Sequence, residues 1–254
     1  MQQKLTVVKI GGNIVDNPVA ANKLIEEFAA LPGYKILVHG GGKVASELGS
    51  KMGIPAQMVN GRRITDAETL KIVTMVYAGL INKTLVALLQ SKGCNALGLS
   101  GPDGGIIKAH KRTGSAIDYG FAGDIDSVNA TQLVSFLNAG LTPVCAPITA
   151  DSAGQLLNTN ADTIASEIAA ACSIAGCETE LVFCFEKPGV MQDADNPDSV
   201  ITQINAAAYT ELLNSGIVHS GMIPKLDNAF KCIERGVKSV RITDAIANRG
   251  TVIS

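Results

Sequence analysis

Short apolar runs alternate along the chain with longer segments in which apolar residues recur every three or four positions. The short runs predict buried strands at 5–10, 35–38, 96–99, 143–146, 181–185 and 240–242. The longer segments predict helices at 19–31, 43–52, 68–90, 131–138 and 161–175, with two more between 205 and 236. Strands that alternate with helices are typical of βαβ units. We therefore expect an α/β fold with a largely parallel sheet.

Two stretches interrupt this alternation. Residues 57–65 are predicted to form a hairpin that turns at Asn60-Gly61. The stretch 106–126, which is rich in glycine and polar residues, predicts a small antiparallel excursion. If the chain forms two lobes, their seam falls near residues 151–158.

Composition narrows the class of protein. The chain has 254 residues, of which 46% are hydrophobic, so it can bury a large core, and its formal net charge of −2 argues against a broad basic surface for nucleic acid. We find no signal-peptide pattern and no apolar run long enough to cross a membrane, and we expect a cytoplasmic protein. The six cysteines form no C-x-x-C pair and are predicted to be reduced, buried thiols: Cys94, Cys145, Cys172, Cys177, Cys184 and Cys232.

Two glycine-rich turns follow the first two predicted strands. The first is KIGG at 9–12, and the second is HGGG at 39–42. Bare backbone N–H groups in such turns can hold a phosphate or a carboxylate, and Lys9 adds a positive charge. The alternative is that both are simply tight turns. Three consecutive glycines at the start of a helix favour a ligand, because glycine weakens a helix start that has no compensating role.

Several common signatures are missing. The chain has neither the G-x-G-x-x-G of a dinucleotide site nor the G-x-x-x-x-G-K-[ST] of a P-loop. His39, His110 and His219 are far apart and lack metal-ligand spacing, so we expect no protein metal site and no histidine-based mechanism.

Three further segments allow two interpretations each. NTNAD at 158–162 precedes a helix; an N-cap with an acidic first turn explains one asparagine and Asp162, but not the second asparagine. NGRR at 60–63 places two arginines on a turn, where they are either solvated or able to grip a carboxylate. SGMIPK at 220–225 places Lys225 at a helix start, where the macrodipole favours a bound anion rather than a lysine.

Together, these segments resemble the N-acetylglutamate kinases of the amino acid kinase family. The resemblance covers nearly the whole chain and rests on the order of five motifs: KIGG at 9–12, VHGGG at 38–42, NGRRIT at 60–65, NTNAD at 158–162 and GMIPK at 221–225. It implies a three-layer αβα sandwich with an open, mainly parallel sheet. It also implies a single domain, with an N-terminal acylamino-acid lobe at about 1–155 and a C-terminal nucleotide lobe at about 156–254.

The implied reaction is phosphorylation of the side-chain carboxylate of an N-acylglutamate by ATP with Mg²⁺, the second step of arginine synthesis. By the motif match, Lys9 and Lys225 flank the transferring phosphoryl group, and Asp162 organises the two lysines. The substrate-binding residues implied are Gly41, Gly42, Arg63, Asn158 and Asn160. The nucleotide-binding residues implied are Gly11, Gly12, Gly189 and Met222.

Simple chemistry agrees with this assignment. A carboxylate nucleophile with a pKa near ~4.3 is already ionised at neutral pH, so it needs no general base. Two lysines and Mg²⁺ offset its repulsion from phosphate, and the metal is expected to be held mainly by ATP oxygens. The chain departs from the family at 185–190, which reads FEKPGV where a Thr/Ser-Asp-Val-x-Gly segment is common. Another amino acid kinase activity, or a sensor without catalysis on the same fold, are the alternatives.

Two finer expectations concern the acyl group and the assembly. Acetyl is the default; Lys108, His110, Lys111 and Arg112 would suit a longer, charged acyl group such as succinyl, unless they form a solvated hairpin. Only residues 1–4 precede the first strand, too few for the extra helix of the arginine-inhibited hexamers, and we expect a homodimer insensitive to arginine. The 68–90 helix is its expected interface, offering Ile72, Val73, Val76, Leu80 and Leu88 unless these face the core.

Overall fold

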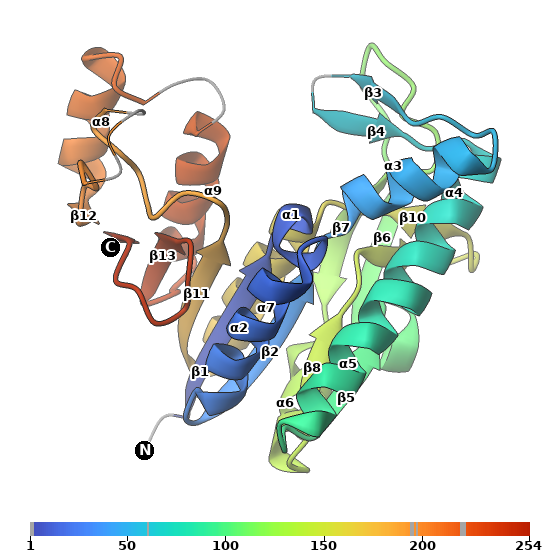
Figure 1. Cartoon of the computed structure of the whole chain (residues 1–254), viewed down its shortest axis with the longest axis horizontal. Coiled ribbons are helices and arrows are strands. Elements are labelled where there is room, and N and C mark those ends of the chain that lie inside the picture. The colour runs from blue at the N-terminus through green and yellow to red at the C-terminus, as the bar shows by residue number, and fades with distance from the viewer. Residues whose placement is uncertain (1–2, 60, 194–195, 197, 219–221) are drawn as a thin grey trace.

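The computed structural model describes residues 3–59, 61–193, 196, 198–218 and 222–254. Its main sheet has eight strands, which come from both the N-terminal and the C-terminal halves of the chain (Figure 1). Its strand order is β12-β14-β13-β11-β1-β2-β8-β5, and every neighbouring pair is parallel except β13 and β14. The strands are β1 (Lys4–Ile10), β2 (Tyr34–His39), β5 (Ala96–Leu99), β8 (Thr142–Cys145), β11 (Glu178–Cys184), β12 (Gln203–Ile204), β13 (Ser239–Thr243) and β14 (Thr251–Ile253).

Helices cover both faces of this sheet, so the predicted three-layer αβα architecture is confirmed. On one face α2 (Pro18–Ala30) and α5 (Asn82–Ser91) pack over alternate strand residues such as Val8 and Leu37. On the other face α6 (Ala130–Asn138), α7 (Ala161–Ile174) and α9 (Ile223–Glu234) cover the intervening residues, which include Val7 and Ile36. Figure 1 shows α2 in front of the strands and α7 behind them.

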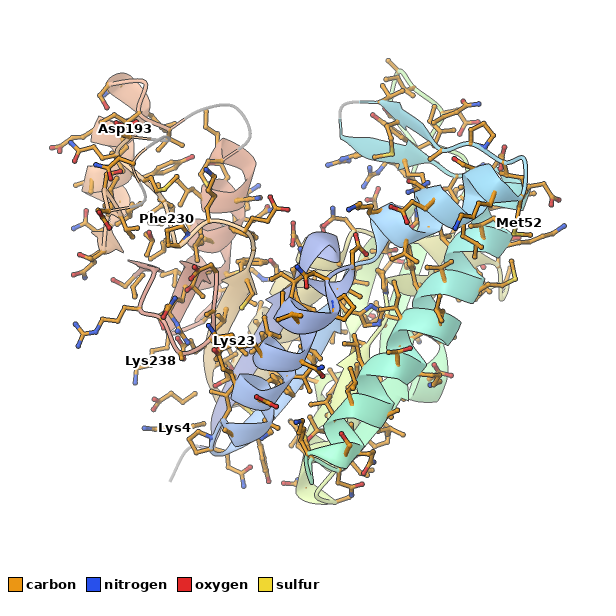
Figure 2. All side chains as sticks on the ribbon, in the orientation of Figure 1. Lys4, Lys23, Met52, Asp193, Phe230 and Lys238 are labelled. Carbon is orange, nitrogen blue, oxygen red and sulfur yellow. The ribbon has the colours of Figure 1, made fainter. Side chains whose placement is uncertain are left out.

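Helix starts follow from local capping. The Asn17 side chain accepts hydrogen bonds from the backbone N–H groups of Val19 and Ala20 at the start of α2. Asn129 caps α6 and Asn205 caps α8 (Ala206–Asn214) in the same way. Between α8 and α9 the rings of Tyr209 and Phe230 stack with centroids 5.1 Å apart, and Phe230 is labelled in Figure 2.

A second, four-stranded sheet stands over the carboxyl end of the main sheet, in the order β10-β9-β6-β7. Its members are β6 (Ile107–Lys111), β7 (Gly123–Val128), β9 (Ile148–Ala150) and β10 (Leu156–Asn158). β6 and β7 are antiparallel, as predicted for 106–126, but the sequence analysis missed β9 and β10 and placed only a seam there. The strands β3 (Gln57–Val59) and β4 (Arg62–Ile64) form the predicted hairpin, and Asn60 lies outside the described residues.

The predicted helix 68–90 is one continuous helix, Ala67–Ser91, with a π-helical turn in its middle. The α-helical parts are α4 (Ala67–Thr74) and α5, and the π-helical part covers Met75–Ile81. The expectation that no apolar segment is long enough to cross a membrane was wrong, because this helix has both the length and the apolar composition. In this fold it packs against α2, β5 and β8 as a core helix, since Leu85 and Leu89 are buried.

The predicted strands and helices all appear, with bounds that differ by a few residues. The predicted helix 43–52 is α3 (Gly42–Lys51), which begins on the last of three glycines. The chain also forms α1 (Gly12–Val15) and a short 3₁₀ turn at Asp103–Gly105, which were not predicted. All six cysteines are free and buried, which confirms that prediction. Lys4 and Lys238, labelled in Figure 2, lie at the amino ends of β1 and β13. The glycine turns lie at the opposite, carboxyl ends of the parallel strands.

Candidate active site

The two glycine turns lie side by side because β1 and β2 are neighbouring parallel strands. The Gly11 N–H donates to the Cys184 carbonyl at 3.1 Å, which ties the first turn to the end of β11. The Gly40 N–H donates to the Ile10 carbonyl at 3.0 Å, which ties the second turn to the end of β1. The carboxyl ends of β11, β1 and β2 are therefore hydrogen-bonded to one another, and ligands of such folds bind at the carboxyl ends of the strands.

The two turns lie against each other. A Cβ on Gly12 would be in van der Waals contact with the second turn, 3.6 Å from the backbone nitrogens of both Gly41 and Gly42. A Cβ on Gly41 would come within 2.3 Å of Cδ1 of Ile81 and 3.1 Å of the Tyr77 ring, so a side chain there would force both neighbours to move. No side chain caps the helices that begin at these turns, so their first N–H groups are open to an anion.

A buried ion pair stands beside the turns. The Lys9 ammonium lies 2.7 Å from Oδ1 of Asp162, and Lys9 is only 8% exposed. Asp162 sits in the first turn of α7, and the Asn160 side chain accepts the Thr163 N–H at 3.0 Å as the N-cap. The N-cap interpretation therefore accounts for Asn160, and Asp162 does more than complement the helix dipole, because it holds Lys9.

Lys225 lies in the first turn of α9, on the other side of this pair. Its ammonium is 3.8 Å from the centroid of the Phe185 ring, a cation–π contact. Burial lowers the pKa of Lys225, the Asp162 carboxylate opposes that shift, and the Lys9 charge adds to it. The three charged groups that the sequence analysis named thus interact electrostatically, although they come from β1, α7 and α9.

Arg63 is held in place rather than solvated. Its Nη2 donates to the Gly42 carbonyl at 2.8 Å and to Oγ of Ser46 at 2.7 Å. The neighbouring Arg62 also reaches the cleft but is exposed, so the two arginines of the hairpin have different surroundings. The sequence could not show which of them is held by α3.

Asn158 and Thr65 link the second sheet to the β3–β4 hairpin. The Asn158 amide donates to Oγ1 of Thr65 at 3.0 Å, and Thr65 is fully buried. Asn158 ends β10, so its side chain faces the same opening as Arg63. Asn158, the asparagine of NTNAD that capping does not explain, therefore has its own hydrogen-bond partner and lines the cleft.

A cleft of about 270 Å³ opens between these groups. Eight of the predicted site residues line it: Lys9, Gly12, Gly41, Gly42, Arg63, Asn158, Asn160 and Asp162. Four predicted residues do not line it: Gly11, Gly189, Met222 and Lys225. The sequence analysis assigned no role there to Tyr77 and Thr159, which also line the cleft.

The nucleotide-side residues have other neighbours. A Cβ on Gly189 would lie 2.7 Å from Oγ1 of Thr251, so glycine is required there by packing. Met222 is half-buried at the N-cap of α9 and packs against the core on that face of the sheet. Ser220 and Gly221 lie outside the described residues, as does His219. Nucleotide contacts of Gly189 and Met222 stay a prediction.

Arg112 also reaches the cleft, from the end of β6. Its guanidinium pairs with the Asp124 carboxylate through Nε, at 3.1 and 3.0 Å, and through Nη2. The pair lowers the pKa of Asp124 through hydrogen bonds from Arg112. Of the other basic residues in this excursion, His110 pairs with Asp126 at 2.6 Å on the surface. Arg112 is thus the member of that basic group that lines the cleft.

His39 supports the second glycine turn from below. It is fully buried, and burial lowers its pKa to about 4, so the ring is neutral near pH 7. Its Nδ1 lies 2.9 Å from the Gly40 carbonyl and its Nε2 lies 3.2 Å from the Asn82 amide nitrogen. The neutral tautomer that satisfies both contacts carries its proton on Nδ1 and accepts at Nε2.

Comparisons with known proteins settle the family. The model of the amino acid kinase family matches residues 4–244. The chain belongs to the amino acid kinase family. It is 56% identical to an acetylglutamate kinase of Cytophaga hutchinsonii, covering 96% of this chain and 92% of that protein. It is 52% identical to an acetylglutamate kinase of Bacteroides fragilis (97% and 94% covered) and 42% identical to one of Methanopyrus kandleri (98% and 100% covered).

Solved structures of the amino acid kinase fold superpose well on this chain. The structure of smu.665 from Streptococcus mutans is 25% identical, with a TM-score of 0.82 over 98% of both chains. Carbamate kinase from Giardia lamblia is 13% identical, with a TM-score of 0.67 over 99% and 98% of the two chains. At that low identity the second comparison supports the fold alone.

Proposed function

We propose that this chain is an ATP-dependent N-acetylglutamate kinase, which converts the side-chain carboxylate of N-acetyl-L-glutamate to an acyl phosphate. That reaction is the second step of arginine biosynthesis. Acetylglutamate kinases at 56% and 52% identity over nearly the whole chain support it. The observation that carries the proposal in the structure is the buried Lys9–Asp162 pair at the meeting point of the glycine turns.

The reaction suits these groups. A carboxylate oxygen of the substrate attacks the γ-phosphorus of ATP, a new P–O bond forms, and the bond to the β-phosphate oxygen breaks as ADP leaves. Phosphoryl transfer depends on positioning and charge neutralisation rather than on covalent help from the protein. We assign Lys9 and Lys225 to the charge that builds up on the transferring group, with Asp162 setting the position of Lys9.

Mg²⁺ would arrive with ATP. Within the described parts of the chain, no three side chains of the types His, Cys, Asp and Glu gather as a metal cage. The carboxylate in this cleft, Asp162, is already paired with Lys9, so phosphate oxygens are the donors that fit Mg²⁺ best. The metal would supply further neutralisation of phosphate charge.

The remaining residues are assigned to the two ligands, with an acylamino-acid lobe at about 1–155 and a nucleotide lobe at about 156–254. Arg63, Asn158 and Asn160 would hold the acylamino acid, and Gly41 and Gly42 would approach it closely. The two asparagines come from the start of the second lobe. For the nucleotide we assign Gly11 and Gly12 to phosphate, and Gly189 and Met222 to the second lobe. The main sheet continues through both lobes, since β1 pairs with β2 on one side and β11 on the other.

The acyl group is acetyl in the relatives' names, and Arg112 is the residue that bears on a longer one. Its charge is already matched by Asp124, which favours acetyl over succinyl. A comparison of kcat/KM for N-acetyl- and N-succinylglutamate tests this directly. A clear preference for the succinyl compound would contradict the assignment of acetyl.

We also propose a homodimer in the cytoplasm. Of the five interface residues predicted on the long helix, Ile72, Val73 and Val76 are buried in the core, Leu88 is partly buried, and Leu80 is 57% exposed. Leu80 borders an apolar groove formed with α2, and Val19 on α2 is 79% exposed. Six free, buried thiols fit a reducing compartment. Light scattering should report a dimer that Leu80→Glu converts to a monomer.

The exposed Leu213 on α8 provides a matched control for that variant. Leu213→Glu adds the same charge to another surface leucine and should leave the dimer intact. If both variants, or neither, alter the assembly, the α2–α5 groove is not the interface.

A substrate panel tests the proposed activity. ADP release is followed in a coupled assay with N-acetylglutamate, glutamate, aspartate and carbamate as acceptors. Turnover with N-acetylglutamate at a much higher kcat/KM than with the others is expected. Preference for carbamate or a free amino acid would assign the chain to another activity of its family, and no turnover with any acceptor would favour a sensor.

A further inference from the structure

Tyr77, in the π-helical turn, lies beside Gly42 and Arg63 on the acylamino-acid side of the cleft. Tyr77 is 5% exposed and lines the cleft. A Cβ on Gly42 would lie 3.9 Å from the Tyr77 hydroxyl and 3.9 Å from Nη2 of Arg63, so both groups stand over the same glycine. Burial raises the pKa of Tyr77, and the positive charge and hydrogen bond of Arg63 oppose this shift.

The π-helical geometry explains how Tyr77 reaches this place. Residues Met75–Ile81 are π-helical inside an otherwise α-helical segment, and such turns are frequent at functional sites. The side chains of both Tyr77 and Ile81 occupy the space that a side chain at Gly41 would need. Leu80, in the same turn, is exposed on the surface. The π-helical turn therefore presents Tyr77 to the cleft and Leu80 to solvent.

Arg63 has two hydrogen-bond acceptors on α3, and the Tyr77 hydroxyl lies over the same glycine. The Gly42 carbonyl and Ser46 belong to α3, and both accept from Nη2. Tyr77 belongs to the long helix and interacts with the same guanidinium. A long arginine side chain loses much conformational freedom when it grips a carboxylate, and partners that fix it beforehand reduce that loss.

We propose that Tyr77 is a positioning residue for the acylamino acid: its hydroxyl accepts a hydrogen bond from Arg63 and holds the guanidinium in its binding orientation. This inference rests on the proposed function, in which Arg63 holds the substrate. The Tyr77 ring has a separate packing role against Gly41. Removal of the hydroxyl alone should therefore weaken substrate binding without disturbing the glycine turn.

The test is Tyr77→Phe, which keeps the ring and deletes the hydroxyl. We expect the KM for N-acetylglutamate to rise about tenfold, the scale of one hydrogen bond to a charged group, with kcat and the KM for ATP within about twofold. Tyr34→Phe is the matched control: the Tyr34 hydroxyl bonds Asn138 at 2.5 Å at the start of β2, remote from the cleft. It should change neither constant.

A double-mutant cycle decides whether Tyr77 acts through Arg63. Tyr77→Phe, Arg63→Ala and the double variant are compared by kcat/KM at low N-acetylglutamate. If the proposal holds, Tyr77→Phe has no further effect once Arg63 is alanine. An unchanged KM in Tyr77→Phe, an equal loss in both backgrounds, or a fall in kcat alone would overturn it.

Two measurements distinguish failure of the Tyr77 proposal from failure of the proposed function. If wild-type protein fails to phosphorylate N-acetylglutamate, the proposed function fails, whatever Tyr77 does. Thermal unfolding with and without N-acetylglutamate then reports binding independently of turnover. If Tyr77→Phe lowers the Tm substantially, Ser46→Ala removes another Arg63 contact from a half-exposed site; an unchanged KM there would also contradict the positioning scheme.

Discussion

The two sides of the cleft are built differently. On the acylamino-acid side, Arg63 and Asn158 are fixed by the hydrogen bonds that they donate to the hydroxyl oxygens of Ser46 and Thr65. On the phosphoryl side, Lys9 and Lys225 are placed by charge and burial, through Asp162 and the Phe185 ring. The difference indicates that the acylamino-acid side selects its ligand by geometry, whereas the phosphoryl side stabilises negative charge that develops during the reaction.

The largest expected effect is a loss of kcat when a lysine on the phosphoryl side of the cleft is removed. Lys9→Ala and Lys225→Ala should each lower kcat about 100- to 1,000-fold, because each removes one donor to developing charge. Lys9→Ala also leaves the Asp162 carboxylate without its ion-pair partner, so its Tm should fall more than that of Lys225→Ala. Steady-state kinetics and thermal unfolding measure both. Near-normal kcat in either variant would remove that lysine from the mechanism.

A smaller effect is expected on the other side. Arg63→Lys keeps the charge but cannot reproduce the planar guanidinium, which reaches the Gly42 carbonyl and Ser46 at once. We expect the KM for N-acetylglutamate to rise about tenfold or more while kcat changes little. The comparison between the two sides would collapse if kcat fell and KM stayed constant.

How far the sequence predicts this site depends on how local the signal is. The glycine turns, Lys9 and the Asp162 helix start are each visible within a few residues, and the structure brings them together because parallel strands end at one edge. Tyr77 could not be found in this way, since the helical pattern of 67–91 does not reveal a π-helical turn. The anchoring of Arg63 on α3, and the short strands β9 and β10, likewise depend on contacts between distant segments.

A third prediction concerns the support of the second glycine turn. The pKa of His39 is about 4 in the folded protein against 6.5 when exposed, so the unfolded chain takes up the proton first as pH falls. The folded state should lose up to about 3 kcal/mol of stability between pH 6.5 and 4 from this group, and the contribution is fully present above pH 6.5.

His39→Gln should remove that component. Urea unfolding at pH 7 and at pH 4.5 measures it: the stability difference between wild type and variant should be larger at pH 7 and shrink at pH 4.5. A difference that is constant with pH would mean that His39 is not held neutral by burial.

The smallest expected effect is a shift in a pH profile. Burial lowers the pKa of Lys225, so its charge is lost as pH rises through a value below the ordinary 10.5. The alkaline limb of kcat should therefore lie below 10.5. Lys225→Arg keeps its charge at high pH, and its remaining activity should show no such limb. An identical limb in both proteins would assign it to another group.

The most direct test of the central claim is detection of the acyl phosphate itself. With ATP, Mg²⁺ and N-acetyl-L-glutamate, hydroxylamine should trap the product as a hydroxamate, in amounts that match the ADP released. Free L-glutamate should yield little, and Lys9→Ala should yield about 1% or less of the wild-type rate. ADP release without hydroxamate, or no hydroxamate from any N-acylglutamate, would contradict carboxylate phosphorylation at this cleft.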